Sequence, residues 1–362
     1  MEHPMICTGI DIFSAKRSDG LSVSNSWLET VCLLVVGMAS ARTVNLTLSV
    51  ARCRRRRRLT ALPSFTAFLA ACGSWGGLDC APRDPDAWAL WQLALCLDRT
   101  HWKIARKQIK LLVLAVATRR YRVPLIWTVL GKSGNSSTKE RIALMKRYLD
   151  LFGAESIKSL LADRELIVFD WLDFLHDQDI PFIIRVRSNQ YVICEDGTRR
   201  SLRELLRTCR GKRAFTAHFG TSKDAAPVCL NFAAKRIKGK ELLSVVSNRP
   251  AHHALTPYRT RWAIEGMFAE AKNKGFNLED TRLSIAKKLS WLLGIVALAM
   301  AWAAKTASAK LGTRKRTRKP HGRYAKSIFR SSLDEIRRLL RNKPENPVRN
   351  WPKIRQKITS GV

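Results

Sequence analysis

The chain has 362 residues, 46% of them hydrophobic, which is long enough for two or three domains with a substantial core. Its 65 Lys and Arg against 29 Asp and Glu give a formal net charge of +36, which repels itself in a compact fold unless an anionic partner relieves it. This charge favours a nucleic-acid partner over a ribosomal or membrane-surface role, because Lys and Arg displace counterions from phosphates.

The nine cysteines and seven histidines are scattered, and no two cysteines form a C-x-x-C pair. Cysteines in apolar runs, such as Cys96, Cys194 and Cys229, indicate buried reduced thiols rather than disulfides or a zinc site. No signal peptide is recognisable, and the apolar runs 27–41 and 289–304 fall short of the roughly 20 residues of a membrane span. We therefore expect two core helices and a soluble protein of the cytoplasm.

The N-terminal region, residues 1–87, contains one predicted helix, over residues 27–41. Residues 51–87 carry an arginine run at 54–58 and several Gly, Pro and Cys, without helical or strand periodicity. Three interpretations of this stretch stay open: a disordered linker, a DNA-contacting arm, or a segment outside the original reading frame.

From residue 88 the pattern changes to alternating strands and helices. Apolar runs predict a strand that ends at Asp98 and another that ends at Asp163, and Ser137 with Glu140 forms a capping box that begins a helix. The predicted elements, in chain order, are strands 93–97, 109–117 and 124–130, a loop 131–136, a helix to about residue 152, strand 159–162, helix 166–178 and strand 181–186. This order predicts an α/β fold with a mixed sheet flanked by helices over residues 88–186, in which neighbouring strand ends bring the two aspartates together.

Residues 187–255 look like a strand-rich insertion, with short β-like runs at 191–194, 214–219, 228–233 and 242–247. Residues 256–310 are strongly helical and would complete the core. Residues 311–362 form a basic C-terminal tail, with a linker at 312–323 and one amphipathic helix at 333–341.

The segment 256–272 holds the strongest pattern. Thr256 is a favourable N-cap and Pro257 a favourable first helical residue. At about 100° per residue, four polar residues fall within a sector of roughly 60° on one helix face; they are Tyr258, Arg261, Glu265 and Lys272. A separate apolar stripe consists of Ile264, Met267, Phe268 and Ala271.

Simpler explanations exist for each carboxylate taken alone. Arg261 and Glu265 could be an ordinary surface pair worth about 0.2–0.5 kcal/mol, and an aspartate after a strand can be a helix cap or a turn residue. Three carboxylates in three such settings, Asp98, Asp163 and Glu265, favour a shared catalytic role.

These residues resemble a known family. The spacing Y-x2-R-x3-E-x6-K of Tyr258, Arg261, Glu265 and Lys272 is similar to that of bacterial insertion-sequence DDE transposases of the Y-R-E-K, cut-and-paste type, which belong to the ribonuclease-H-like superfamily. The sequences around Asp98 (residues 97–102) and Asp163 (residues 162–165) resemble the first two acidic motifs of that family. The resemblance covers about residues 88–340, and residues 28–46 weakly.

The resemblance implies a fold, a reaction and roles for residues. Asp98, Asp163 and Glu265 would hold two Mg²⁺ ions, for which Mn²⁺ can substitute, and the enzyme would cut and join DNA strands. Tyr258, Arg261, Lys272 and, beside the second aspartate, Arg164 would bind DNA. The implied partners are the terminal inverted repeats of the element and the target DNA, bound by a homodimer at the bacterial nucleoid, with no membrane.

The chain departs from the family pattern in two places. No Trp lies between residues 190 and 261 to stack a flipped base, although Phe219, Phe232 or Tyr191 could substitute. Residues 51–87 do not look like the usual helical end-binding region. Two alternatives follow: a catalytically defective DNA-binding relative that occupies element ends or pairs with an active copy, and a different ribonuclease-H-like nuclease.

Overall fold

The structure is a computed structural model that describes most of the chain from residue 92 onward and a smaller part before it. The described residues are 6–8, 25–45, 48, 92–104, 107–117, 122–130, 135–219, 228–237, 241–272, 274–281, 283, 285–311, 318–320, 322 and 324–342. The interpretations of residues 51–87 and the predicted loop residues 131–134 lie outside this set.

Eleven strands of the described part form one mixed sheet in the order β1-β4-β3-β2-β5-β6-β11-β10-β9-β7-β8. β2 pairs parallel with β5, and β5 parallel with β6, whereas the other pairs are antiparallel. The strands are β1 (Ile6–Thr8), β2 (Leu93–Ile104), β3 (Lys107–Ala117), β4 (Arg122–Leu130), β5 (Ile157–Ala162), β6 (Phe182–Val186), β7 (Tyr191–Ile193), β8 (Arg199–Ser201), β9 (Lys212–Phe219), β10 (Val228–Arg236) and β11 (Leu242–Ser247).

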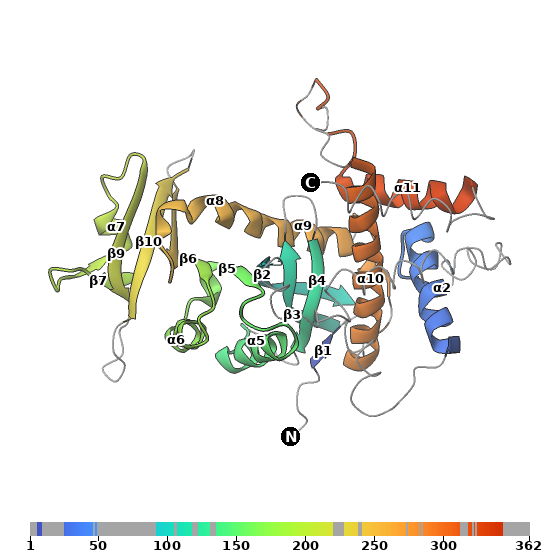
Figure 1. Ribbon diagram of the computed structural model, residues 1–362, viewed down its shortest axis with the longest axis horizontal. Coiled ribbons are helices and arrows are strands. Elements are labelled where there is room, and N and C mark those ends of the chain that lie inside the picture. The colour runs from blue at the N-terminus through green and yellow to red at the C-terminus, as the bar shows by residue number, and fades with distance from the viewer. Residues whose placement is uncertain are drawn as a thin grey trace.

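Helices cover both sides of the central strands. In Figure 1, α5 and α6 lie on one side of these strands and α8 and α9 on the other, with α10, α2 and α11 gathered at one end. The helices are α2 (Asn25–Ala41), α5 (Thr138–Phe152), α6 (Phe169–Asp177), α7 (Leu202–Leu205), α8 (Leu255–Tyr258), α9 (Trp262–Ala271), α10 (Ala286–Leu311) and α11 (Ile328–Asn342), and the 3₁₀ turns are η2 (Arg164–Leu166), η3 (Ala251–His253), η4 (Arg259–Arg261) and η5 (Leu278–Asp280).

Two hydrophobic cores form because successive strand residues point to opposite sides of the sheet. Cys96 and Leu161 belong to the core that includes residues of α2, α9, α10 and α11, and we call this side the α9 face. Leu97 and Leu160 belong to the core that includes residues of α5 and α6, the α5 face. This alternation fixes the face to which each site residue points.

The predicted fold class is confirmed: the chain has an α/β, ribonuclease-H-like fold with a mixed sheet, flanking helices and a helical C-terminal region. The capping box is also confirmed, because the Ser137 hydroxyl accepts from the Glu140 backbone N–H and the Glu140 carboxylate accepts from the Ser137 N–H. α6 begins at Phe169 rather than residue 166, because the chain first makes the 3₁₀ turn η2.

The strand-rich segment extends the same sheet. β11 pairs antiparallel with β6, with Ser244 opposite Val186 and Ser247 opposite Ile183, and β10, β9, β7 and β8 follow outward. The four strands expected there are present, and the sequence did not predict β8 or the short helix α7. One hydrogen-bonded sheet therefore includes strands of both predicted segments, residues 88–186 and 187–255.

Cysteine burial was predicted only in part. Cys96 is buried, Cys194 is partly exposed and Cys229 is exposed, and all three are free thiols. The expectation of a buried thiol is wrong for Cys229, because alternation along β10 turns Leu230 into the core and Cys229 outward.

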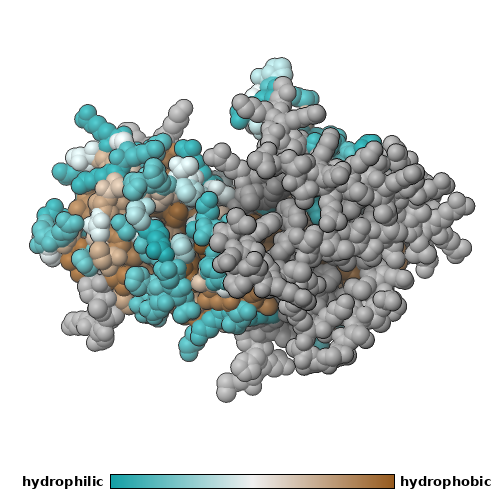
Figure 2. Space-filling model, in the orientation of Figure 1, coloured by the Kyte–Doolittle hydropathy of each residue, from teal (hydrophilic) through white to brown (hydrophobic). Residues whose placement is uncertain are grey.

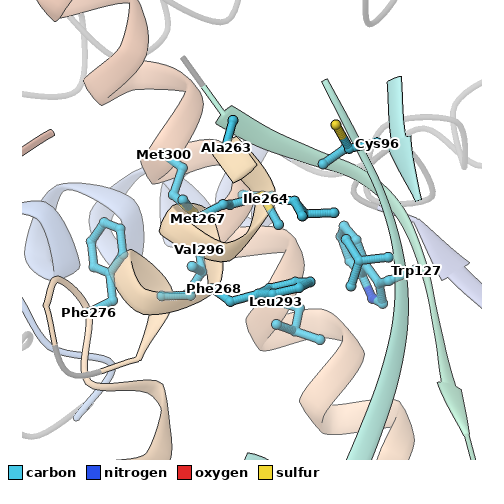
Figure 3. Packing of buried hydrophobic residues seen from close by; sticks show 14 of the residues in the cluster. Cys96, Trp127, Ala263, Ile264, Met267, Phe268, Phe276, Leu293, Val296 and Met300 are labelled. Carbon is cyan, nitrogen blue, oxygen red and sulfur yellow. The ribbon is translucent and has the colours of Figure 1, made fainter. Parts of the chain in front are cut away.

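The apolar run at 289–304 belongs to a longer helix than expected. α10 has 26 residues, and its stretch Ala286–Ala307 has the length and composition of a membrane span. However, 72% of the most apolar window is buried inside the protein, where Leu293 and Val296 pack beside Phe268 of α9 (Figure 3). α10 is thus a core helix of this fold, and the expected length was too short.

Candidate active site

Asp98 and Asp163 lie side by side on neighbouring parallel strands. The last parallel pair of β2 and β5 joins Leu97 to Ala162, so the two aspartates are the next residues of each strand path. Neighbouring strands lie about 4.8 Å apart. Cys96 and Leu161, two residues earlier, point to the α9 face, and the backbone at Asp163 is extended, so both carboxylates point to that face.

One part of the strand prediction is wrong: Asp98 does not end its strand. β2 continues to Ile104 because it pairs on its other side with β3, where Asp98 is opposite Val113. What ends at Asp98 is only the parallel ladder with β5. Asp98 is therefore held by a continuous strand, which makes its backbone position more rigid than a loop would.

Asp98 is a buried carboxylate with two partners, and only 9% of the residue is exposed. Its Oδ1 accepts a hydrogen bond from the Arg99 backbone N–H at 2.7 Å, and its Oδ2 lies 3.4 Å from Nη1 of Arg261. Burial raises the pKa of Asp98 to about 6, against the opposing effects of the Arg99 N–H and the Arg261 guanidinium. A positive charge beside Asp98 therefore favours its ionised form.

Asp163 has an unsatisfied carboxylate. It occupies the N-cap position of η2, but its side chain makes no capping hydrogen bond. Its Oδ1 is buried and has no hydrogen-bond partner among the described residues. The simple explanation of Asp163 as a helix cap is therefore wrong. A buried carboxylate oxygen without a donor is unfavourable, and a cation would relieve it.

The predicted start of the helix that carries Glu265 is also wrong. After Pro250 the chain turns through η3, and α8 begins at Leu255, so Thr256 and Pro257 lie inside the first turn instead of capping it. The 3₁₀ turn η4 then separates α8 from α9. The expected apolar stripe is confirmed, because Ile264, Met267, Phe268 and Ala271 are all buried; Figure 3 shows Ile264 and Phe268 between α10 and the sheet.

Arg261 is the cation that joins the carboxylates. Its Nη2 donates to Glu265 Oε1 at 2.9 Å, while Nη1 approaches Asp98, and only 5% of its side chain is exposed. Burial lowers its pKa, but the nearby Tyr258, Asp163 and Asp98 raise it, and the net shift is upward. An ordinary surface salt bridge is therefore excluded, because Arg261 is buried among the acids.

The other two residues of the predicted helix face, Tyr258 and Lys272, have different surroundings. Tyr258 is 3% exposed, its hydroxyl has no hydrogen-bond partner in the described part of the chain, and its ring lies 5.9 Å from the Arg261 guanidinium carbon. Lys272 is the C-cap residue of α9, and its Nζ donates to the His101 carbonyl oxygen at 2.6 Å. Tyr258 and Arg261 are therefore buried whereas Glu265 is half-exposed, and the 3₁₀ turn η4 interrupts the single helix face predicted for the four residues.

Asp98, Asp163 and Glu265 offer the type of ligand that a hard divalent ion prefers, but their carboxylates do not converge on one point in this conformation. Within the described ranges no three His, Cys, Asp or Glu side chains are close enough to hold a metal ion. Arg261 lies between Asp98 and Glu265, whose side chain is 45% exposed. Carboxylate oxygens are the ligands Mg²⁺ prefers, and the unpartnered Asp163 Oδ1 supplies a free one.

Sequence reasoning missed Arg185. β5 and β6 pair Ala162 with Ile184, so Arg185 is the β6 residue beside Asp163. Alternation along β6 was the available signal, because Ile183 on the α9 face predicts the same side for Arg185. The Arg185 guanidinium makes an ion pair with Glu241. Arg164, which follows Asp163 directly, is exposed on η2.

The family follows from comparison with known proteins. The transposase DDE domain family matches residues 92–302, which is more than half of the chain and includes Asp98, Asp163 and Glu265. No curated protein matches the chain by sequence. Together with the ribonuclease-H-like sheet, this match shows that the chain belongs to the family of transposases with a DDE domain.

Proposed function

We propose that the protein is a metal-dependent transposase that cuts and joins DNA at the ends of a bacterial insertion element, with Asp98, Asp163 and Glu265 as its acidic triad. One observation carries the proposal: two aspartates occupy adjacent positions of parallel strands on one face, and Arg261 links Asp98 to the glutamate. Among the described residues, Asp163 makes no capping hydrogen bond and its Oδ1 has no hydrogen-bond partner, which leaves this oxygen available to a metal ion.

The three side chains would hold two Mg²⁺ or Mn²⁺ ions. When bound, such a pair activates an attacking oxygen and stabilises the leaving one in an in-line displacement at phosphorus. Asp98 and Asp163 are fixed by the sheet, whereas Glu265 is half-exposed on α9 and free to change rotamer. Binding of the ions therefore requires the side chains of Arg261 and Glu265 to move but does not require the backbone to move.

The remaining residues of the Y-R-E-K pattern act on the DNA. Once other cations neutralise the carboxylates, the Arg261 guanidinium is available to a phosphate, which it can bind through two parallel hydrogen bonds. Lys272 offers a second positive charge beyond the end of α9, and Arg164 a third beside Asp163. Tyr258 packs against Arg261 and limits its positions.

The substrates follow from this chemistry. The protein binds the terminal inverted repeats of its element and then target DNA, and two copies hold the two ends together. A net charge of +36 suits such a partner, because each phosphate contact releases counterions. The protein would act in the bacterial cytoplasm, at the nucleoid.

The test is cleavage of labelled duplexes that carry the element ends, with Mg²⁺ or with EDTA. We expect nicks with free 3′-hydroxyls for the wild type with Mg²⁺, and loss of cutting by at least roughly 10²-fold in Glu265→Gln, as for loss of one electrostatic group in a preorganised site. Glu155→Gln is the matched control, because Glu155 is an exposed acid outside the triad.

Two results would overturn the proposal. One is cutting that persists in EDTA or in Glu265→Gln. The other is salt-sensitive DNA binding with no nicking of element ends or of random duplexes at any Mg²⁺ concentration, which is the behaviour of a defective DNA-binding relative.

A further inference from the structure

A pocket of about 700 Å³ opens where β6 ends, beside α7 and the start of β11. Its lining contains two acids, Glu204 and Glu241, and six arginines, which gives a local charge of six minus two, or +4. The arginines are Arg164, Arg185, Arg187, Arg203, Arg207 and Arg236. Figure 2 shows hydrophilic and hydrophobic residues interspersed over the visible face of the strand-rich end of the molecule.

Both acids and two of the arginines already serve the fold. Glu204 accepts from the Ser201 N–H at 3.0 Å as part of the capping box of α7, and Glu241 pairs with Arg185. Arg236 donates to the backbone oxygens of Leu206, Arg207 and Cys209, which follow α7. These contacts shape the wall of the pocket and engage one carboxylate oxygen of each acid.

The other four arginines make no such contacts with the described residues. Arg164, Arg187, Arg203 and Arg207 are exposed, and in the described part of the chain none of their guanidinium groups makes an ion pair or a side-chain hydrogen bond. Four unpaired positive charges around one concavity repel one another, so an anion placed among them is attracted by all four.

The pocket borders the candidate active site through two of its arginines, Arg164 and Arg185. Arg185 is the β6 neighbour of Asp163, and Arg164 is the next residue in the chain. From β5 the pocket is reached across β6 and β11, each step about 4.8 Å. A strand of DNA held at the carboxylates would therefore lie within reach of these arginines.

We propose that this arginine pocket binds the phosphodiester backbone of the DNA strand next to the cutting site. The proposal rests on the proposed function and names a contact surface of the same site. Among the described residues, the lining has no aromatic side chain on which a base could stack, and its apolar members are Val186 and Leu242. Contacts to phosphates by exposed arginines hold DNA in register without reading its sequence.

The test uses full-length protein and a fluorescent duplex of about 30 base pairs in EDTA, titrated at roughly 50 to 200 mM KCl. The pocket variant is Arg203→Ala/Arg207→Ala. The matched control is Arg210→Ala/Lys212→Ala, which removes the same charge from exposed residues outside the lining. If both pocket arginines contact phosphates, the slope of log K against log salt becomes less negative by about 1.8, since each contact contributes about 0.9.

An equal change in both variants would overturn the proposal, because it would reflect general charge and not the pocket. An unchanged slope in the folded pocket variant would overturn it as well. If that variant fails to fold by circular dichroism, Arg164→Ala/Arg187→Ala tests the opposite wall with the same expected slope change.

The two proposals can fail separately, because binding in EDTA does not require cutting. A reduced slope in the pocket variant together with absent nicking supports the pocket and removes the proposed catalysis. Mg²⁺-dependent nicking by the wild type together with a wild-type slope in the pocket variant removes only the pocket.

Discussion

Replacing Arg261 with alanine tests whether the guanidinium holds the carboxylates together in the absence of metal. The side chain is 5% exposed and bonds both Asp98 and Glu265, so its removal leaves Asp98 buried without a cation. Breaking a buried pair in this way typically costs about 3–5 kcal/mol.

The structure sets a smaller value for this site. Asp98 has a pKa raised to about 6 by burial, so it can escape by taking up a proton, which at about pH 7.5 costs roughly 1.5 × 1.36, or about 2 kcal/mol. We therefore expect Arg261→Ala to lower the free energy of unfolding by about 2 kcal/mol at that pH. The attraction needs the ionised carboxylate, so the loss shrinks as the pH falls through about 6.

The assay is urea unfolding of the wild type and Arg261→Ala in EDTA at about pH 7.5 and about pH 5. Arg259→Ala is the control, because Arg259 is an exposed arginine two residues earlier in the same turn. A loss that is the same at both pH values, or absent at the higher one, would refute the placement of Arg261 against an ionisable Asp98. Added Mg²⁺ should recover more stability in Arg261→Ala than in the wild type, because it replaces the lost cation.

Three further changes report on the frame of the site. Burial raises the pKa of Glu270 to about 7, although the Arg122 charge opposes this shift. The free energy of unfolding of the wild type therefore falls as the pH rises from about 4.5 through 7. Between about pH 5 and pH 8, the free energy of unfolding of Glu270→Gln should rise by on the order of 3 kcal/mol relative to that of the wild type, as measured by chemical denaturation. Ser137→Ala removes the hydroxyl half of the α5 capping box and should lower unfolding free energy by about 1 kcal/mol in urea titrations. Ile264→Ala leaves a cavity under α9 and should cost about 2–5 kcal/mol by the same measurement, with a lower rate of cutting because Glu265 sits on that helix.

Each of these has a result that contradicts it. A pH-independent difference for Glu270→Gln would mean that Glu270 is not desolvated. A neutral Ser137→Ala would show that the Glu140 half of the box suffices. An unchanged free energy of unfolding in Ile264→Ala would place that side chain outside the core. Ile264→Val should then leave the free energy of unfolding unchanged as well.

Much of the fold could be read from local pattern. Alternation and apolar runs located strands β2 to β6 and most of the strand-rich segment, and a two-residue signal, Ser137 with Glu140, marked the start of α5. The acidic residues were found because each follows or lies within such a pattern. These features depend on residues a few positions apart, so the sequence carries them without a tertiary structure.

The predicted element boundaries were wrong where a neighbouring segment of the chain extended an element or shifted its start. β2 runs past Asp98 because β3 pairs with it, and α8 begins before Thr256 because helical turns already start after Pro250. Neither cause is visible in the segment itself. The same holds for Arg185, which gains its place beside Asp163 from the register of β5 with β6.

The sequence by itself determined which residues carry charge, the helix and strand periods, and the i,i+4 relation of Arg261 to Glu265, since all three are properties of short stretches of chain. Only the tertiary structure decided that Arg261 reaches Asp98, 163 positions away, and that arginines from η2, β6 and α7 line one pocket. The physical reason is that these contacts depend on strand register and on the packing of α9 over the sheet, and register is set by pairing between distant segments.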